Sequence, residues 1–67
     1  MELKYEIQVG SRRFLVESDK GEAHVRMIAH RVEQRMQQIA ASVRTADSAR
    51  LAIMTALTFA EEAWEQD

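Results

Sequence analysis

The stretch from Ser48 to Trp64 constrains the fold of this chain more than any other part of its sequence. Its sequence is SARLAIMTALTFAEEAW, which is the most apolar run in the chain and contains no Gly or Pro. Apolar side chains at helical spacing predict a helix here, and on a helical wheel their arc is about 160° wide. We expect this helix to carry more apolar surface than the chain buries by itself. The stretch therefore predicts a self-associating module and not an enzyme.

The length of the chain supports the same conclusion. A chain of 67 residues forms one domain at most, and its core is marginal because a small domain buries a smaller fraction of its surface. Small domains are usually stabilised by disulfides, a metal or a partner chain. The sequence has no Cys, and His24 and His30 fall on different faces of a helix. We expect neither a metal nor another cofactor, which leaves oligomerisation.

The net charge of −2 gives no general reason to expect a nucleic acid as the partner. No apolar run reaches the roughly 18 residues needed to span a membrane, so we expect no membrane insertion. The N-terminal MELKYEIQV alternates charged and apolar residues, unlike a signal peptide. The cytoplasm is the expected location.

Residues 2–17 alternate between apolar and polar side chains, which predicts a pair of strands. The Gly10-Ser11 pair between them, with Gly first, suits a two-residue type II′ turn. This turn places apolar residues opposite apolar ones and forms one opposite-charge pair. The predicted pairs are Val9 with Arg12, Ile7 with Phe14, Tyr5 with Val16, Gln8 with Arg13, Glu6 with Leu15 and Lys4 with Glu17. A slip of one residue would destroy this match.

An amphipathic helix is predicted over residues 20–43. Apolar side chains repeat there at intervals of three and four residues and form a stripe about 120° wide. Asp19 and Glu22 fit a capping box at the start of this helix. The remaining faces are polar, so we expect the helix to pack through one side.

The helical period breaks at residues 44–47. Asp47 or Ser48 caps the next helix, which we expect over residues 47–66. So short a connection makes the helices either antiparallel neighbours or the arms of a sharp elbow.

The second helix has two surfaces of different character. Small side chains at four-residue spacing form a ridge that permits close approach of another helix, and large apolar side chains flank the ridge. The predicted dimer interface consists of Ala52, Ile53, Ala56, Leu57, Ala60 and Trp64. Leu51 and Met54 lie outside this arc. They either cover the end of the first helix or form an exposed apolar patch for a partner.

The C-terminal end of this helix lacks a Gly or Asn cap after Trp64. Glu61, Glu62, Glu65 and Asp67 lie where the helix macrodipole favours cations. We expect the natural helix to run on as a coiled coil, and this chain to be cut short or naturally truncated.

No catalytic motif is present, since the sequence has no Cys nucleophile, no Gly-rich phosphate loop and no HExxH. Arg12 and Arg13, which follow the hairpin turn, have three interpretations. They protect the sheet edge and aid solubility, or they bind the carboxylates of an acidic protein through bidentate contacts. In the third interpretation they form a nucleic-acid site with Arg26, Arg31 and Arg35.

Three motifs occur in the same order in a known family. They are Ile7-Gln8-Val9-Gly10-Ser11-Arg12-Arg13-Phe14, then Ser18-Asp19, then Leu51-Ala52-Ile53-Met54-Thr55-Ala56-Leu57-Thr58. Together they resemble the N-terminal part of ZapA, the bacterial cell-division accessory family, over nearly all of the chain. Thr58 stands where that family commonly has Asn, and Ser11 separates the Gly from the Arg that usually follows it.

The resemblance implies binding to FtsZ, the tubulin-like ring protein, at the cytoplasmic face of midcell. It also implies that basic hairpin residues and the start of the second helix carry the FtsZ contacts. By position these residues are Arg12, Arg13, Arg50 and Met54. The family continues into a long coiled coil that makes antiparallel tetramers, whereas we expect this chain to form a homodimer through its second helix.

We predict a single α+β head domain over residues 1–67, in which the hairpin is followed by two helices in the order ββαα. The second helix forms the dimer interface and the start of a coiled coil that is absent or truncated. The predicted function is the non-catalytic binding and association of FtsZ filaments through a dimeric head. Two alternatives stay open: a generic homodimerisation module of another cytoplasmic regulator, and a small nucleic-acid binder.

Overall fold

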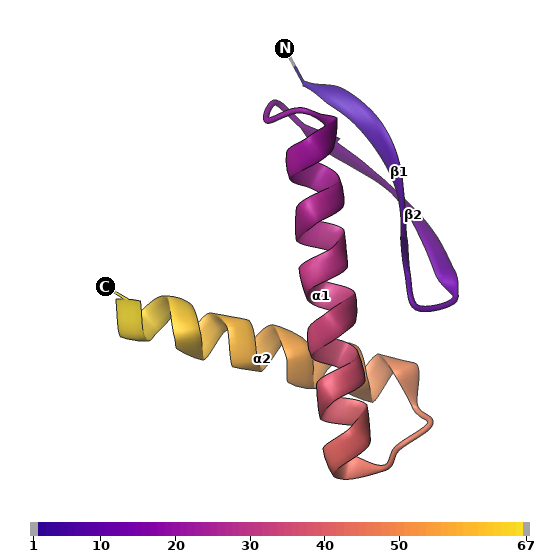
Figure 1. Ribbon diagram of the computed structural model, residues 1–67, viewed down its shortest axis with the longest axis vertical. Helices are drawn as coiled ribbons and strands as arrows, with labels where there is room; N and C mark the ends of the chain where they lie inside the picture. The colour runs from indigo at the N-terminus through magenta and orange to yellow at the C-terminus, as the bar shows by residue number, and fades with distance from the viewer. Residues whose placement is uncertain (1, 67) are drawn as a thin grey trace. The chain divides into compact units, whose positions relative to one another are not determined.

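The computed structural model describes residues 2–66, which form two strands and two helices in the order ββαα (Figure 1). The strands are β1 (Leu3–Val9) and β2 (Arg12–Ser18), and the helices are α1 (Glu22–Val43) and α2 (Ser48–Gln66). This is the predicted α+β arrangement. The chain forms two compact units, residues 1–34 and 35–67, which divide inside α1.

The hairpin has the register that the sequence predicted. Its strands are antiparallel, every predicted pair is present, and Leu3 pairs with Ser18 in addition. Gly10 has a φ of 62°, whereas Ser11 has no positive φ, which is the sign pattern of the predicted type II′ turn. Gly suits this position because it lacks the Cβ that a positive φ would strain. Local turn chemistry and apolar pairing therefore determine this part of the fold.

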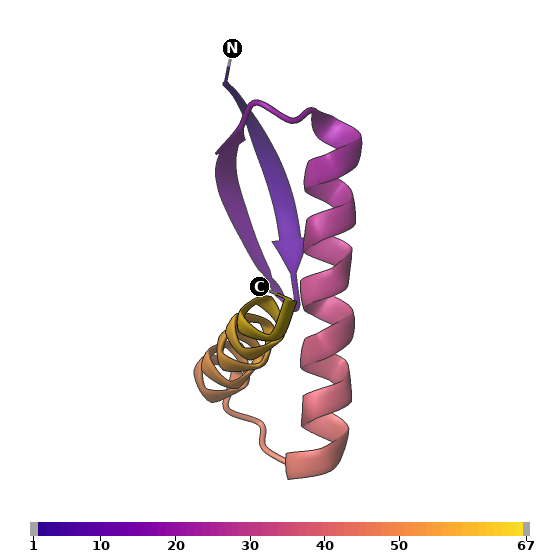
Figure 2. The same cartoon turned by 90° about the vertical axis from the view of Figure 1, so that its left-hand side faces the viewer.

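Within the first unit the hairpin lies alongside the N-terminal part of α1 (Figures 1 and 2). Val25 of α1 is 6% exposed, and the strand residues Ile7 and Val16 are half-buried. The Arg26 side chain connects the two elements, because its Nη1 donates a hydrogen bond to the Glu6 backbone oxygen at 3.2 Å. The apolar face of the hairpin thus packs toward α1.

Helix α1 begins at Glu22, whereas the sequence pattern predicted a start at residue 20. The Gly21 backbone oxygen accepts a hydrogen bond from the Val25 amide at 3.2 Å, so Gly21 occupies the capping position. The predicted capping box of Asp19 with Glu22 is therefore wrong, since Asp19 lies too far before the first turn. Gly21 has a φ of 91°, which is not helical and which prevents the helix from starting earlier.

Hydrogen bonds cap both helices where they meet the connection between them, namely the C-terminal end of α1 and the N-terminal end of α2. Arg44 has a φ of 53°, and its amide donates to the Ala40 backbone oxygen at 3.0 Å, which is left-handed capping geometry. The carboxylate of Asp47 accepts hydrogen bonds from the amides of Ala49 at 3.1 Å and Arg50 at 3.2 Å. Of the two caps that the sequence allowed, Asp47 is the one used, and α2 begins directly after it.

Within the second unit, α2 crosses the C-terminal part of α1 (Figures 1 and 2). The connection thus forms a sharp elbow and not a pair of antiparallel neighbours. The α2 residues that lie toward α1 are buried or half-buried and recur at intervals of three and four. They are Leu51, Met54, Thr55, Thr58, Phe59 and Glu62, and we call them the inner side of α2.

Candidate functional site

The opposite side of α2 carries every residue predicted for the dimer interface. These residues, which we call the outer face, are Ala52, Ile53, Ala56, Leu57, Ala60 and Trp64, and all are exposed. The exposed fraction is 62% for Ile53, 66% for Leu57 and 81% for Trp64. Large apolar side chains that adjoin small ones on one helical face form a contiguous patch, and such patches mark interaction sites.

The outer face is more apolar than the inner side. The inner side includes Thr55, Thr58 and Glu62, whereas the outer face has apolar side chains throughout. Thr55 is 2% exposed. Its hydroxyl donates to the Leu51 backbone oxygen at 2.8 Å, and the Thr58 hydroxyl donates to that of Met54 at 2.9 Å. These bonds satisfy the hydroxyl groups inside the helix, so α1 covers the more polar side of α2 and leaves the more apolar side uncovered.

A polar contact joins α1 to α2 at Arg35. Its guanidinium pairs with both carboxylate oxygens of Glu62: Nη1 contacts Oε2, and Nη2 donates to Oε1 at 3.3 Å. The Cζ atom of Arg35 lies 4.8 Å from the centre of the Phe59 ring, within the range of a cation–π interaction. Hydrogen bonding to Glu62 raises the pKa of Arg35 above its ordinary value. We call Arg35, Phe59 and Glu62 the Arg35 cluster.

The Arg35 cluster is less exposed than the other ion pairs within residues 2–66. The side chains of Arg35 and Glu62 are 25% and 41% exposed, whereas those of the other pairs are between 56% and 72% exposed. Less solvent means weaker screening, so this ion pair has more influence on structure than the exposed ones.

The sequence pattern did not predict this cluster. Glu62 stands in an acidic C-terminal end beside Glu61, and Arg35 is one of several arginines on a polar helix. A signal was nevertheless present in the spacing, because Phe59 and Glu62 continue the three- and four-residue intervals that start at Leu51.

Arg12 and Arg13 are exposed at the start of β2, next to the hairpin turn. Arg13 Nη1 lies 3.8 Å from Glu6 Oε1 across the sheet, and these side chains are 72% and 66% exposed. Arg12 makes no ion pair or side-chain hydrogen bond with any residue in the range 2–66. The Arg12 guanidinium is therefore available to a partner, and Arg13 is held by an exposed pair that contributes little to stability.

Arg50 and Met54 lie in the first part of α2. The Arg50 side chain is exposed and forms no ion pair within the part of the chain that the structure describes. Met54 is half-buried on the inner side, as is Leu51, which agrees with the interpretation that these two residues cover the end of the first helix. Arg50 and Met54 belong to the second compact unit, and Arg12 and Arg13 belong to the first.

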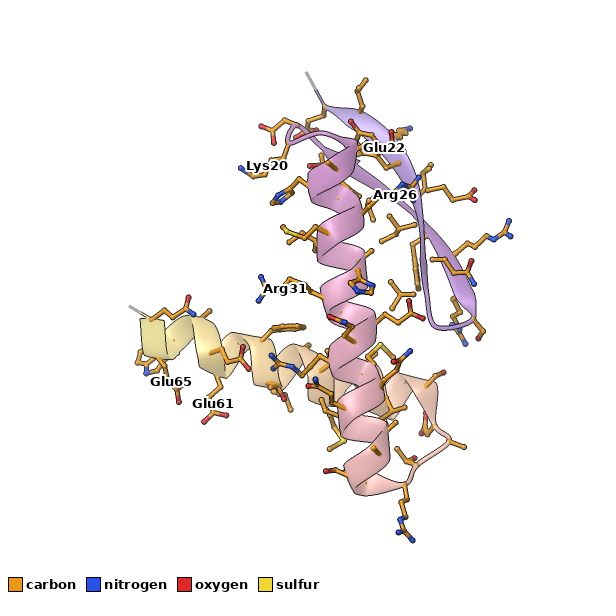
Figure 3. The ribbon with its side chains drawn as sticks, in the orientation of Figure 1. Lys20, Glu22, Arg26, Arg31, Glu61 and Glu65 are labelled. Carbon is orange, nitrogen blue, oxygen red and sulfur yellow. The ribbon has the colours of Figure 1, made fainter. Side chains whose placement is uncertain are left out.

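Several arginines considered for a nucleic-acid site have acidic partners. Arg26 Nε lies 3.1 Å from Glu22 Oε1, and Figure 3 labels both residues at the start of α1. Arg13 and Arg35 are also in ion pairs. Such pairing reduces the positive charge offered to phosphates, on which non-specific nucleic-acid affinity depends.

Two further kinds of site are absent from residues 2–66. No three or more His, Asp or Glu side chains come together there as a metal-binding group. Neither helix in this range is both long enough and apolar enough to cross a membrane.

The chain was compared with the models of known protein families. The family model described as "Cell division protein ZapA" matches residues 5–67, which include most of the hairpin and both helices. This family consists of non-enzymatic accessory proteins of cell division. A search of curated proteins and a search of solved structures each found no match.

Proposed function

Because this chain belongs to the ZapA family of cell division proteins, we propose that it binds FtsZ and promotes the association of FtsZ filaments. It acts as a single head domain over residues 1–67, in the cytoplasm at the midcell division ring. Its role is to hold filaments together and involves no catalysis. The observation that carries this proposal is the uncovered outer face of α2, because filament association needs a protein with more than one binding head.

The outer face of α2 binds a second copy of the chain. Ile53, Leu57 and Trp64 are more than half exposed in the single chain, and fully burying a large apolar side chain contributes about 1.5–3 kcal/mol. The alanines between them let two helix backbones approach closely. The result is a homodimer, and tetramers form where the helix continues as a coiled coil.

A dimer promotes filament association through linkage of its heads. When one head is bound, the second head faces a high effective concentration of FtsZ, and avidity can exceed the affinity of a single head by about 10²–10⁴-fold. Two filaments, or two subunits of one filament, are then held by one dimer.

Arg12 and Arg13 carry the FtsZ contact, and the exposed Arg50 contributes to it as the resemblance implies. Met54, the fourth residue predicted for this contact, is half-buried on the inner side of α2 and packs toward α1. Arg12 is exposed and free of acidic partners within residues 2–66, and Arg13 has only a weak one. A guanidinium binds a carboxylate through two parallel hydrogen bonds, so an acidic surface of FtsZ fits this hairpin end. Salt should weaken the contact, because the Debye length is about 8 Å at physiological ionic strength.

Co-pelleting with polymerised FtsZ tests this contact. The double variant Arg12→Glu plus Arg13→Glu should bind with a dissociation constant at least about tenfold higher, a loss of about 1.4 kcal/mol. The matched control is Lys20→Glu plus Arg31→Glu, which makes the same change in charge at two exposed cations labelled in Figure 3. Equal pelleting of the two double variants would show that the hairpin end is not the contact.

The same outer face also fits the alternative, a homodimerisation module of another cytoplasmic regulator. A wild-type protein that dimerises in light scattering but does not pellet with FtsZ would favour this alternative. A wild-type protein that stays monomeric across the concentration range would contradict the dimer itself.

A further inference from the structure

Apolar burial alone does not explain which side of α2 packs on α1. The inner side and the outer face lie on roughly opposite sides of a helical wheel. A roll of α2 by about half a turn about its axis would carry Glu62 away from Arg35 and bring Trp64 toward α1. The rolled arrangement would turn an entirely apolar set of side chains toward α1 in place of the inner side, which includes Thr55, Thr58 and Glu62. Some other interaction therefore favours the inner side.

We propose that Arg35 is the positioning residue that selects the inner side of α2 and thereby keeps the outer face free for a second copy of the chain. The inference rests on the proposed homodimer and names the residue that controls it. Arg35 does not touch the partner, and it acts through the orientation of α2.

The contacts of the Arg35 cluster form in only one orientation of α2, as a residue that selects this orientation requires. The planar guanidinium contacts both oxygens of Glu62 and lies 4.8 Å from the Phe59 ring centre. Glu62 and Phe59 are three residues apart on one side of α2, so both contacts form in the same orientation of the helix. A roll breaks both contacts at once and leaves Arg35, whose side chain is 25% exposed, without its carboxylate. Loss of the carboxylate and of the ring contact together is unfavourable, by an amount that solvent screening of this partly exposed pair reduces.

The other polar side chains on the inner side can be buried without leaving a hydrogen-bonding group unsatisfied. The hydroxyls of Thr55 and Thr58 are bonded to backbone oxygens of their own helix. No buried side-chain nitrogen or oxygen within residues 2–66 lacks a hydrogen-bond partner. The observed orientation thus satisfies every polar group on this side, and the ion pair adds the preference for it.

The role of Arg35 predicts what a chain without the pair does. Its α2 rolls, buries Ile53, Leu57 and Trp64 against its own α1, and offers no apolar face to a second chain. If about a tenth of the molecules still present the outer face, self-association weakens by about a hundredfold, because both copies in a homodimer must present it. The chain remains folded but becomes monomeric.

The test removes both charges without adding apolar surface to the inner side, with Arg35→Gln plus Glu62→Gln. Gln is a good helix former, so the variant should stay folded by circular dichroism. The matched control is Arg31→Gln plus Glu65→Gln, the same exchange at exposed positions on the two helices (Figure 3). Sedimentation velocity measures self-association, and the emission of Trp64, which is the single Trp of the chain, measures exposure of the outer face.

In a solution dilute enough for the wild type to be monomeric, we expect solvent-exposed Trp64 emission from the wild type and the control. The Arg35→Gln plus Glu62→Gln variant should show blue-shifted emission at the same dilution and a self-association constant weakened at least about tenfold. Arg35→Glu alone should show the same changes, because it brings two carboxylates together. Adding Glu62→Arg to it rebuilds the ion pair but not the contact with Phe59, so it should reverse part of both changes.

Unchanged Trp64 emission in the dilute Arg35→Gln plus Glu62→Gln variant overturns the inference, whatever the stability of that variant. Should this variant fail to fold, Arg35→Glu and the charge-swapped variant decide together. A blue shift in Arg35→Glu that the added Glu62→Arg reverses supports the role of Arg35, and wild-type emission in both variants overturns it. If the wild-type protein never dimerises, the proposed function is contradicted. That result is separate from the test of Arg35, because Trp64 emission is compared between monomers.

Discussion

Leu15 of the hairpin and Leu57 of α2 are equally exposed, at 66%, but their neighbours differ. Leu15 lies opposite Glu6 in the sheet and between Arg13 and Glu17 along β2, so it is a single apolar side chain among charges. Leu57 lies within the outer face, among other apolar side chains. Single exposed apolar residues are normal on protein surfaces, whereas contiguous ones mark interaction sites. The surroundings of an exposed leucine, and not its exposed fraction, indicate a binding surface.

The strongest test of this comparison places a charge at each leucine. Leu57→Glu should weaken self-association by at least about 2 kcal/mol, roughly a thirtyfold rise in the dissociation constant, because the new carboxylate would be desolvated in the interface. Leu15→Glu is the matched control and should leave the constant unchanged. Sedimentation velocity across concentration measures both variants, and equal effects would contradict the assignment of the outer face.

Substitution of Gly10 in the turn of the hairpin should have a smaller effect, and on stability rather than on self-association. Gly10→Ala should lower the free energy of unfolding by about 1 kcal/mol, because its φ of 62° is strained for a residue with a Cβ. The new Cβ would meet no atom within 4 Å, so the loss is conformational and not steric. Urea denaturation measures it, with Ser11→Ala as the control at a position without a positive φ. Self-association of the folded variant should equal that of wild type, and a loss would mean that the hairpin contributes to the dimer interface.

The smallest expected effect is a gain in stability at the connection between the helices. Arg44→Gly should raise the free energy of unfolding by about 0.5–1 kcal/mol, since Gly adopts the observed φ of 53° without strain. Arg31→Gly removes the same side chain inside α1 and should lower it by about 1 kcal/mol. Thermal unfolding compares the two variants, and a loss at both positions would argue that the Arg44 side chain itself stabilises the connection.

The turn and the register of the hairpin were predictable because their determinants are local. Gly10 specifies the turn, and the alternation on either side of it determines the register. The start of α1 could not be predicted from the capping pattern of Asp19 with Glu22, since Gly21 overrides that pattern. The outer face was predicted as a set of residues, because helical spacing alone groups them. The ion pair between Arg35 and Glu62 could not be predicted, because the two residues are 27 positions apart and no periodicity connects one to the other.

The two-residue turn of the hairpin has a consequence for the order of events during synthesis. A hairpin forms in about 1–10 μs, whereas a ribosome adds about 5–20 residues per second. Strands β1 and β2 leave the ribosome first, so they can sample their native register before α2 has left it. A hairpin alone is marginally stable, so its pairing persists once α1 has emerged to cover it. The apolar outer face of α2 leaves the ribosome last, after the hairpin and α1, which shortens the time in which that face can meet an unfolded neighbour.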